Sequence, residues 1–165
     1  IQNASVASLS AEQVADLCTE IEHVSWIKEE VPPSRRNISR ILDQNCPAIH
    51  GVMGGGGGRP MILEHARSSR GAVHACQYCD VVQRVWELLD DGDMDAAGDL
   101  FEHLLPSLEL ERLMGMAYAK EIMVRRGIFK NHRVRGRAQA LDAYDMAEID
   151  RTWARIQPYL TWPGA

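Results

Sequence analysis

Short apolar runs alternate with helix-like segments through the first half of this chain, and this alternation restricts the possible folds more than any other feature. The apolar runs lie at residues 24–28, 48–53 and 72–75, and the segments between them place apolar residues at helical spacing. Parallel strands need a crossover connection long enough to hold a helix, which produces this order of elements. The sequence therefore predicts a parallel α/β fold, in which functional residues collect at the carboxyl ends of the strands.

Capping residues place the helices of the first half. Ser10 and Gln13 have the spacing of a capping box, in which each side chain binds the backbone of the other residue. Ser34 is expected to cap a second helix, and Pro60 to lie in the first turn of a third.

The second half of the chain is predicted to be helical. Asp80 is expected to cap one helix, and Pro106 to separate two others, at 94–105 and 108–126. A last helix is expected to begin at Asp145.

Lys28 is the strongest candidate for a catalytic residue. It ends an apolar run and is followed by Glu29, Glu30 and a proline pair. Burial disfavours the charged form of a lysine, and a neutral amine is a nucleophile that forms an imine with a carbonyl compound. Glu30 lies two residues further on and therefore on the same face of an extended strand, where it would handle protons. A solvated lysine and a solvated glutamate just outside a strand would give the same sequence pattern.

A run of five glycines, residues 54–58, follows the second predicted strand. Successive backbone N–H groups in such a run can bind a phosphate or a carboxylate, although a flexible turn has the same composition. No Gly-Lys-Ser/Thr follows, and no acidic residue ends a later strand at the spacing of a dinucleotide site, so nucleotide-binding loops of both kinds are excluded. Lys28, the glycine run and the region of Cys76 all follow strands, so we expect them to share one rim of the sheet.

Cys76 and Cys79 form a CxxC pair, which serves zinc binding or dithiol redox chemistry in other proteins. A structural zinc site needs two further ligands, and His74 is the only nearby candidate, so we expect no metal and no cofactor. Four cysteines are too few and too scattered for a disulfide scaffold, which favours reduced thiols and a cytoplasmic location.

Charge and hydrophobicity exclude two classes of partner. The formal net charge is −5, and the basic residues gather only in a short strip around Arg125, Arg126 and residues 130–137, so we expect no nucleic-acid binding. No apolar run approaches the length of about 20 residues that spans a bilayer, so we expect no membrane insertion. The chain opens without Met or a signal peptide, which suggests a fragment or a processed protein.

Several motifs resemble one known family. The run Val24–Glu30 resembles the Schiff-base strand of the dihydrodipicolinate synthase and N-acetylneuraminate lyase family. Further segments resemble a branch of that family with dehydratases and aldolases of 2-keto-3-deoxy sugar acids; these are Gly54–Arg59, Glu64, Arg70–Ala72 and His74–Asp80. The resemblance extends from Ile1 to about Leu160.

The resemblance implies a fold and a division of the chain. Members of the family are (β/α)8 barrels with extra C-terminal helices, and such a barrel takes about 250 residues. This chain resembles the C-terminal half only: residues 1–91 would form strands five to eight, and residues 92–165 the helical extension. The family's substrate-carboxylate loop lies in the other half. The full-length enzyme is expected to be a homo-oligomer that needs no cofactor.

The resemblance also implies roles for single residues. Lys28 would form a Schiff base with a 2-oxo acid such as pyruvate, and the reaction would be aldol cleavage, condensation or dehydration. The family usually carries tyrosine and asparagine on strand five, whereas this chain has Gln2 and Asn3, and an amide cannot transfer protons as a phenol does. The remaining candidates are the pocket-lining residues Gly55, Gly56, Gly57 and Gly58, and the carbonyl of Val73 facing the imine. For proton handling the candidates are Glu30, His74 and Gln2, of which Gln2 can hydrogen-bond a substrate.

Two alternatives remain open. In the first, the chain is a non-catalytic half-barrel that is inactive or folds only on association, because half of a barrel exposes strand edges. Otherwise the CxxC pair would define a metal or redox module.

Overall fold

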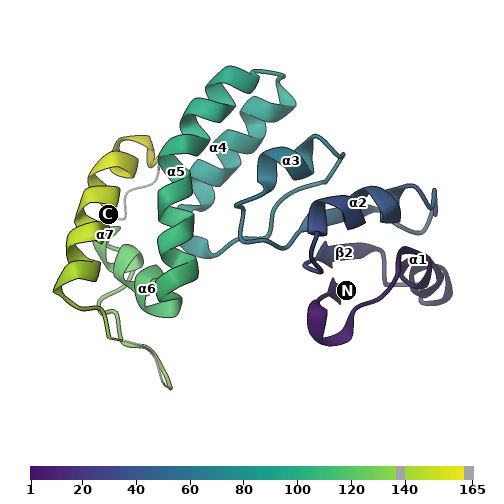
Figure 1. Cartoon of the computed structure of the whole chain (residues 1–165), viewed down its shortest axis with the longest axis horizontal. Helices are drawn as coiled ribbons and strands as arrows, with labels where there is room; N and C mark the ends of the chain where they lie inside the picture. The colour runs from purple at the N-terminus through teal and green to yellow at the C-terminus, as the bar shows by residue number, and fades with distance from the viewer. Residues whose placement is uncertain (137–139, 162–165) are drawn as a thin grey trace. The chain divides into compact units, whose positions relative to one another are not determined.

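The computed structural model describes residues 1–136 and 140–161. The chain divides into two compact units, residues 1–74 and residues 75–165. The first unit contains β1 (Gln2–Asn3), α1 (Ala11–Glu20), β2 (Trp26–Glu29), α2 (Ser34–Leu42), β3 (Gly51–Gly54) and α3 (Met61–His65). The second contains α4 (Cys79–Asp90), α5 (Met94–Met114), α6 (Met116–Arg125) and α7 (Ala143–Ile156) (Figure 1).

The first unit is built on a parallel sheet, as the alternating pattern predicted. Its strands lie in the order β1-β2-β3, and both neighbouring pairs are parallel. The predicted strand at 72–75 is reduced to one bridge between Gly54 and Ala72, beside which the Val73 amide donates to the Gly54 carbonyl over 2.7 Å. The ladder ends there because the chain turns into a 3₁₀ helix at Cys76.

One face of this sheet packs against α1 and α2. Ile27 of β2 and Val52 of β3 are buried with four residues of these helices, Val14, Cys18, Ile38 and Ile41. Side chains alternate between the faces of a strand, so Trp26 and Lys28 lie opposite Ile27. Trp26 is 47% exposed, and Lys28 is partly exposed. The lysine therefore stands on the less covered face of β2.

Two predictions about caps have different outcomes in the first unit. The capping box of Ser10 and Gln13 is present at the start of α1. Ser34 does not cap α2, which corrects the prediction: it is the first residue of the helix, after Pro33. Its hydroxyl instead donates to Glu64 Oε1 over 3.2 Å, so a tertiary contact replaces the local cap.

The second unit is helical, as predicted. Helix α4 packs along α5, and α5 also contacts α6 and α7 (Figure 1). The buried side chains come from all four helices and include Val81, Val85, Leu104, Leu108, Ile122 and Ile149. The predicted domain boundary after residue 91 falls inside this unit, between α4 and α5, which pack together. The division into a half-barrel, residues 1–91, and a helical extension, residues 92–165, remains a prediction.

The predicted break at Pro106 is wrong. Helix α5 continues through this proline to Met114. A proline inside a helix loses one hydrogen bond, but Leu104 and Leu108 on either side are both buried, so packing holds the helix together. The break comes at Gly115 instead, where φ is +58°, a value that glycine adopts without a steric penalty.

The starts of α4 and α7 also differ from the prediction. Asp80 lies inside the first turn of α4 and forms an ion pair with Arg126 instead of capping. Helix α7 is capped by Asp142, with Asp145 binding back in a capping box. In the described part of the chain, no helix has the length and apolar character needed to cross a membrane.

Candidate functional site

The sheet register brings three predicted site residues together at the carboxyl end of β1 and β2. Gln2 and Lys28 are paired across the two strands, so their side chains lie on the same face. Lys28 Nζ lies 2.9 Å from Glu30 Oε1, and the amide of Gln2 donates to Glu30 Oε2. We call Gln2, Lys28 and Glu30 the lysine cluster.

The lysine cluster is accessible without being fully solvated. The side chain of Lys28 is 28% exposed to solvent, and that of Glu30 is 26% exposed. One carboxylate oxygen of Glu30 contacts Lys28 and the other accepts from Gln2, so the carboxylate is held in one orientation. An ion pair at this exposure contributes only about 0–1 kcal/mol to stability. The contact also places a possible proton acceptor directly beside the amine.

A buried carboxylate lies directly behind the lysine. Glu29 is fully buried on the opposite face of β2. It accepts hydrogen bonds from Asn3 Nδ2 and the Val31 amide, both at 2.7 Å, and from Asn37 Nδ2 at 3.5 Å. Burial raises the pKa of Glu29 although these bonds favour its charged form. Glu29 thus ties β1, the loop after β2 and α2 to the backbone that carries Lys28.

A second buried carboxyl group fills the space beside Gly54. A Cβ atom at this position would lie 1.7 Å from Glu64 Oε2, so only glycine leaves room for the carboxyl group. Ser34 donates to Glu64 Oε1, whereas Oε2 is buried and has no hydrogen-bond partner within the described residues. Burial raises the pKa of Glu64, and the nearby charge of Glu29 raises it further.

Sequence reasoning assigned no role to Glu29 or Glu64. A signal was present, because Glu29 alternates with buried Ile27 and Glu64 follows buried Met61 by three residues. An acid at a periodic core position indicates either a misassigned face or a buried carboxyl group.

The glycine run is an ordered turn beside the lysine cluster. A Cβ on Gly55 would lie 1.9 Å from Glu30 Cγ, so this glycine lets Glu30 reach Lys28. The Gly55 amide donates to the Glu29 carbonyl over 2.8 Å. Gly57 and Gly58 have φ values of +66° and +81°, which favour glycine. The predicted proximity of the run to Lys28 is therefore observed, whereas ligand binding by Gly55, Gly56, Gly57 and Gly58 remains a prediction.

The other predicted site residues lie at the end of the first unit or beyond it. Val73 follows Ala72, which forms the bridge to Gly54 at the end of β3. His74 is partly exposed and ends the first unit. The roles of the Val73 carbonyl and of His74 remain predictions. Cys76 and Cys79 are exposed thiols of the second unit, and no group of three or more potential metal ligands occurs within residues 1–136 and 140–161.

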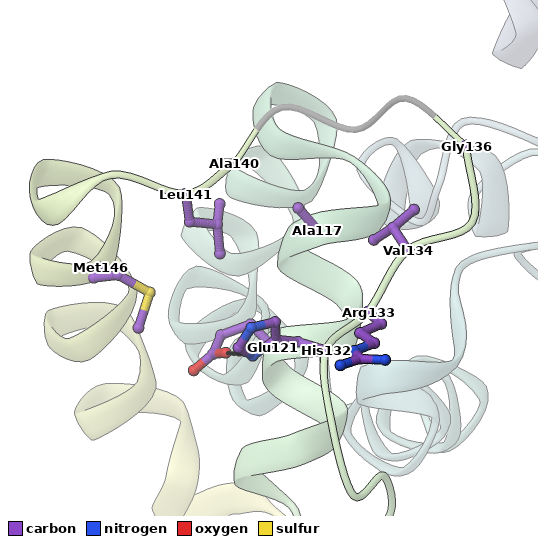
Figure 2. Close-up of a pocket in the computed structure, with 9 residues that line it drawn as sticks. All are labelled: Ala117, Glu121, His132, Arg133, Val134, Gly136, Ala140, Leu141 and Met146. Atoms are coloured by element: carbon purple, nitrogen blue, oxygen red, sulfur yellow. Dashed lines mark ion pairs between the residues drawn. The ribbon is translucent and has the colours of Figure 1, made fainter.

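The second unit contains a separate pocket of about 360 Å³, drawn in Figure 2. His132 and Glu121 face each other there, with Nδ1 and Oε2 3.3 Å apart. Arg125 pairs with the other oxygen of Glu121, over 3.0 Å. The lining consists of Ala117, Glu121, His132, Arg133, Val134, Gly136, Ala140, Leu141 and Met146. None of the predicted site residues is among them, so the pocket is distinct from the lysine cluster.

Known proteins resemble nearly the whole chain, although no family model matches it. L-2-keto-3-deoxyarabonate dehydratase of Azospirillum brasilense is 26% identical over 161 residues, which make up 96% of this chain and 52% of that enzyme. Dihydrodipicolinate synthase of Rhodopseudomonas palustris superposes with a TM-score of 0.85 at 20% identity, covering 93% of this chain and 54% of that one. YagE, a prophage protein of the same family from E. coli K12 solved with pyruvate, gives a TM-score of 0.77 at 16% identity, covering 94% and 55%.

These comparisons confirm the resemblance and the fold class that the sequence predicted. The chain has the fold of the C-terminal half of a (β/α)8 barrel followed by helices. It spans about half the length of the relatives that it matches.

Proposed function

We propose that this chain carries the Schiff-base half of a lyase of the dihydrodipicolinate synthase type that acts on a 2-oxo acid. The observation that carries the proposal is the ion pair of Lys28 and Glu30, 2.9 Å apart at the carboxyl end of β2. In barrels of this kind the reacting groups stand at the carboxyl ends of the strands. A lysine next to a held carboxylate has both the nucleophile and the base that imine formation needs.

The reaction begins with a proton transfer from the Lys28 ammonium group to Glu30. The neutral amine then attacks the keto carbon of the 2-oxo acid and forms a carbinolamine. Glu30 returns its proton to the carbinolamine hydroxyl, which leaves as water, and an iminium ion remains. The iminium withdraws electrons from the adjacent carbon, so a proton, a hydroxyl group or a carbon–carbon bond at the neighbouring positions can be lost.

Gln2 shapes this site without transferring protons. Its amide donates to Glu30 and holds that carboxylate toward Lys28. A carboxamide is neither an effective acid nor an effective base near neutral pH, so Glu30 takes the acid and base steps, with His74 as a second candidate. The carbonyl of Val73 and the amides of residues 55–58 would contact the substrate from the edge of the sheet.

The relatives narrow the substrate class. One is a dehydratase of L-2-keto-3-deoxyarabonate, and another was solved with pyruvate, so a 2-oxo acid with or without a sugar-derived tail is the best candidate. The chain spans about half the length of these enzymes, so we assign activity to a completed barrel. The family resemblance favours a homo-oligomer for that assembly, and the few scattered cysteines favour a cytoplasmic location.

Borohydride trapping tests the proposal. The chain is incubated with pyruvate or a 2-keto-3-deoxy sugar acid, reduced, digested and mapped by mass spectrometry. Only three lysines occur, Lys28, Lys120 and Lys130, so the modified residue is identified without ambiguity. We expect an adduct on Lys28 that Lys28→Arg abolishes and the control Lys120→Arg retains. A completed barrel, with the missing half supplied, that gives no adduct on Lys28 would refute the mechanism.

A second candidate is a half-barrel that associates without catalysis. It is favoured by Trp26, which leaves 47% of its surface exposed on the lysine face. An associated form that gives no borohydride adduct on Lys28 would distinguish this candidate from the first, and molecular mass measured on dilution tests the association itself. A stable monomer at low concentration, with the strand content retained, would argue against association.

A further inference from the structure

Cys76 and Cys79 stand on one short turn at the start of the second unit. Residues 76–78 form a 3₁₀ helix, and Cys79 is the first residue of α4. Side chains three residues apart eclipse one another on a 3₁₀ turn. Both cysteines are exposed, whereas Gln77 and Tyr78 between them are buried. The two thiols therefore share the solvent side of the turn.

The inner side of this turn is firmly anchored. The hydroxyl of Tyr78 lies 2.8 Å from that of Tyr118, and both rings are buried. Gln77 Nε2 donates to Glu111 Oε2 over 2.6 Å, and the Gln77 carbonyl accepts from Arg126. These bonds fix the backbone between the cysteines, so the two thiols stay on the same side without further folding.

The Cys79 thiol contacts the backbone of Cys76. Cys79 Sγ donates to the carbonyl of Cys76 over 3.2 Å. Partial burial raises the pKa of Cys79, and the neighbouring Cys76 and Asp80 raise it further. The described residues provide no group of three metal ligands, so the arrangement offers two sulfur atoms and no completed metal site.

We propose that Cys76 and Cys79 form a reversible intramolecular disulfide by exchange with a low-molecular-weight disulfide. In the first step, the Cys76 thiolate attacks one sulfur of that disulfide, which releases one thiol and leaves a mixed disulfide on Cys76. In the second, the Cys79 thiolate attacks Cys76 Sγ and expels the second thiol. Two electrons and two protons pass from the protein to the small disulfide, which becomes two thiols. This exchange is independent of the proposed lyase chemistry.

Glutathione disulfide is the probe that tests this exchange. The chain is equilibrated with increasing ratios of oxidised to reduced glutathione, quenched with acid, alkylated and mapped by mass spectrometry. We expect a cross-link between Cys76 and Cys79 with little mixed adduct. Cys79→Ser should accumulate the mixed disulfide on Cys76, because the resolving thiol is gone. The control Cys18→Ser/Cys46→Ser, in the first unit, should close as the unmodified chain does.

Other outcomes would overturn the proposal. A mixed disulfide that persists on Cys76 in the unmodified chain would show that Cys79 cannot resolve it. Disulfide-linked dimers, or a cross-link between Cys18 and Cys46 in place of the expected one, would also overturn the proposal. Cys79 is exposed, so circular dichroism should find Cys79→Ser folded. Cys18 is buried, so the fold of the control variant is verified by circular dichroism before its exchange is measured.

Discussion

The buried carboxyl group of Glu64 makes a specific prediction about pH and stability. The change is Glu64→Gln, which keeps the shape of the side chain and removes its charge. Ser34 keeps its partner in this variant, because the oxygen of the new amide can still accept the hydrogen bond from the serine hydroxyl. What disappears is the ionisation of a group whose pKa is raised by burial and by the charge of Glu29.

The sign of the pH dependence follows from this raised pKa. At low pH the carboxyl group is protonated in both the folded and the unfolded chain, and it contributes no pH dependence. As the pH rises above 4.5, the ordinary pKa of a glutamate, the unfolded chain ionises while the folded chain still holds the proton, so the folded state loses stability. The loss stops once the pH exceeds the folded-state pKa. The stability of Glu64→Gln relative to the unmodified chain should therefore rise from pH 4 to pH 8.

The magnitude can be bounded from the contacts. Each unit by which the folded-state pKa is raised costs about 1.4 kcal/mol at high pH. The amide nitrogen of the glutamine would take the buried position of Glu64 Oε2, which has no partner, so the cost of about 1–3 kcal/mol for such an atom stays in the variant. The pH-dependent gain is therefore about 1.4 kcal/mol for each unit by which burial raises the pKa, and each kcal/mol corresponds to roughly 2–4 °C in Tm.

Urea unfolding followed by circular dichroism at several pH values measures this effect. Glu20→Gln, which changes an exposed acid at the end of α1, is the matched control. The difference between Glu64→Gln and the unmodified chain should grow with pH, whereas the control should run parallel to the unmodified chain. If Glu64→Gln changed the stability of the protein equally at pH 4 and pH 8, the pKa of this carboxyl group would not be raised by burial.

Three further predictions concern packing and the lysine cluster. Gly55→Ala would place Cβ 1.9 Å from Glu30 Cγ, so it should displace Glu30 and reduce borohydride trapping on Lys28 several-fold, while an unchanged adduct yield would contradict the role of this glycine. Arg126→Met would leave Asp80 without its bidentate partner at 2.9 and 3.0 Å and should cost about 3–5 kcal/mol, measured by thermal unfolding at neutral pH. Leu104→Ala would empty a fully buried position of α5 and should cost about 2–5 kcal/mol in the same assay; a smaller loss would indicate that the helix collapses around Pro106.

Much of the fold was predictable because it depends on local patterns. The alternating apolar runs predicted the parallel sheet, and the spacing of Ser10 and Gln13 predicted the start of α1. Pro106 misled the prediction, because its effect depends on whether the flanking turns are packed. Buried Leu104 and Leu108 hold those turns in place, and no local pattern reports that.

For the candidate site too, some features were predictable from the sequence and others were not. The sequence by itself determined the fold class, the position of Lys28 at a strand end and the resemblance to Schiff-base lyases, because periodicity and motif order are properties of neighbouring residues. Only the tertiary structure decided that Gln2 and Lys28 share Glu30, and that Glu64 occupies the space beside Gly54. Strand register and helix packing join residues that are distant in the chain, and these contacts follow from the packing of the whole unit.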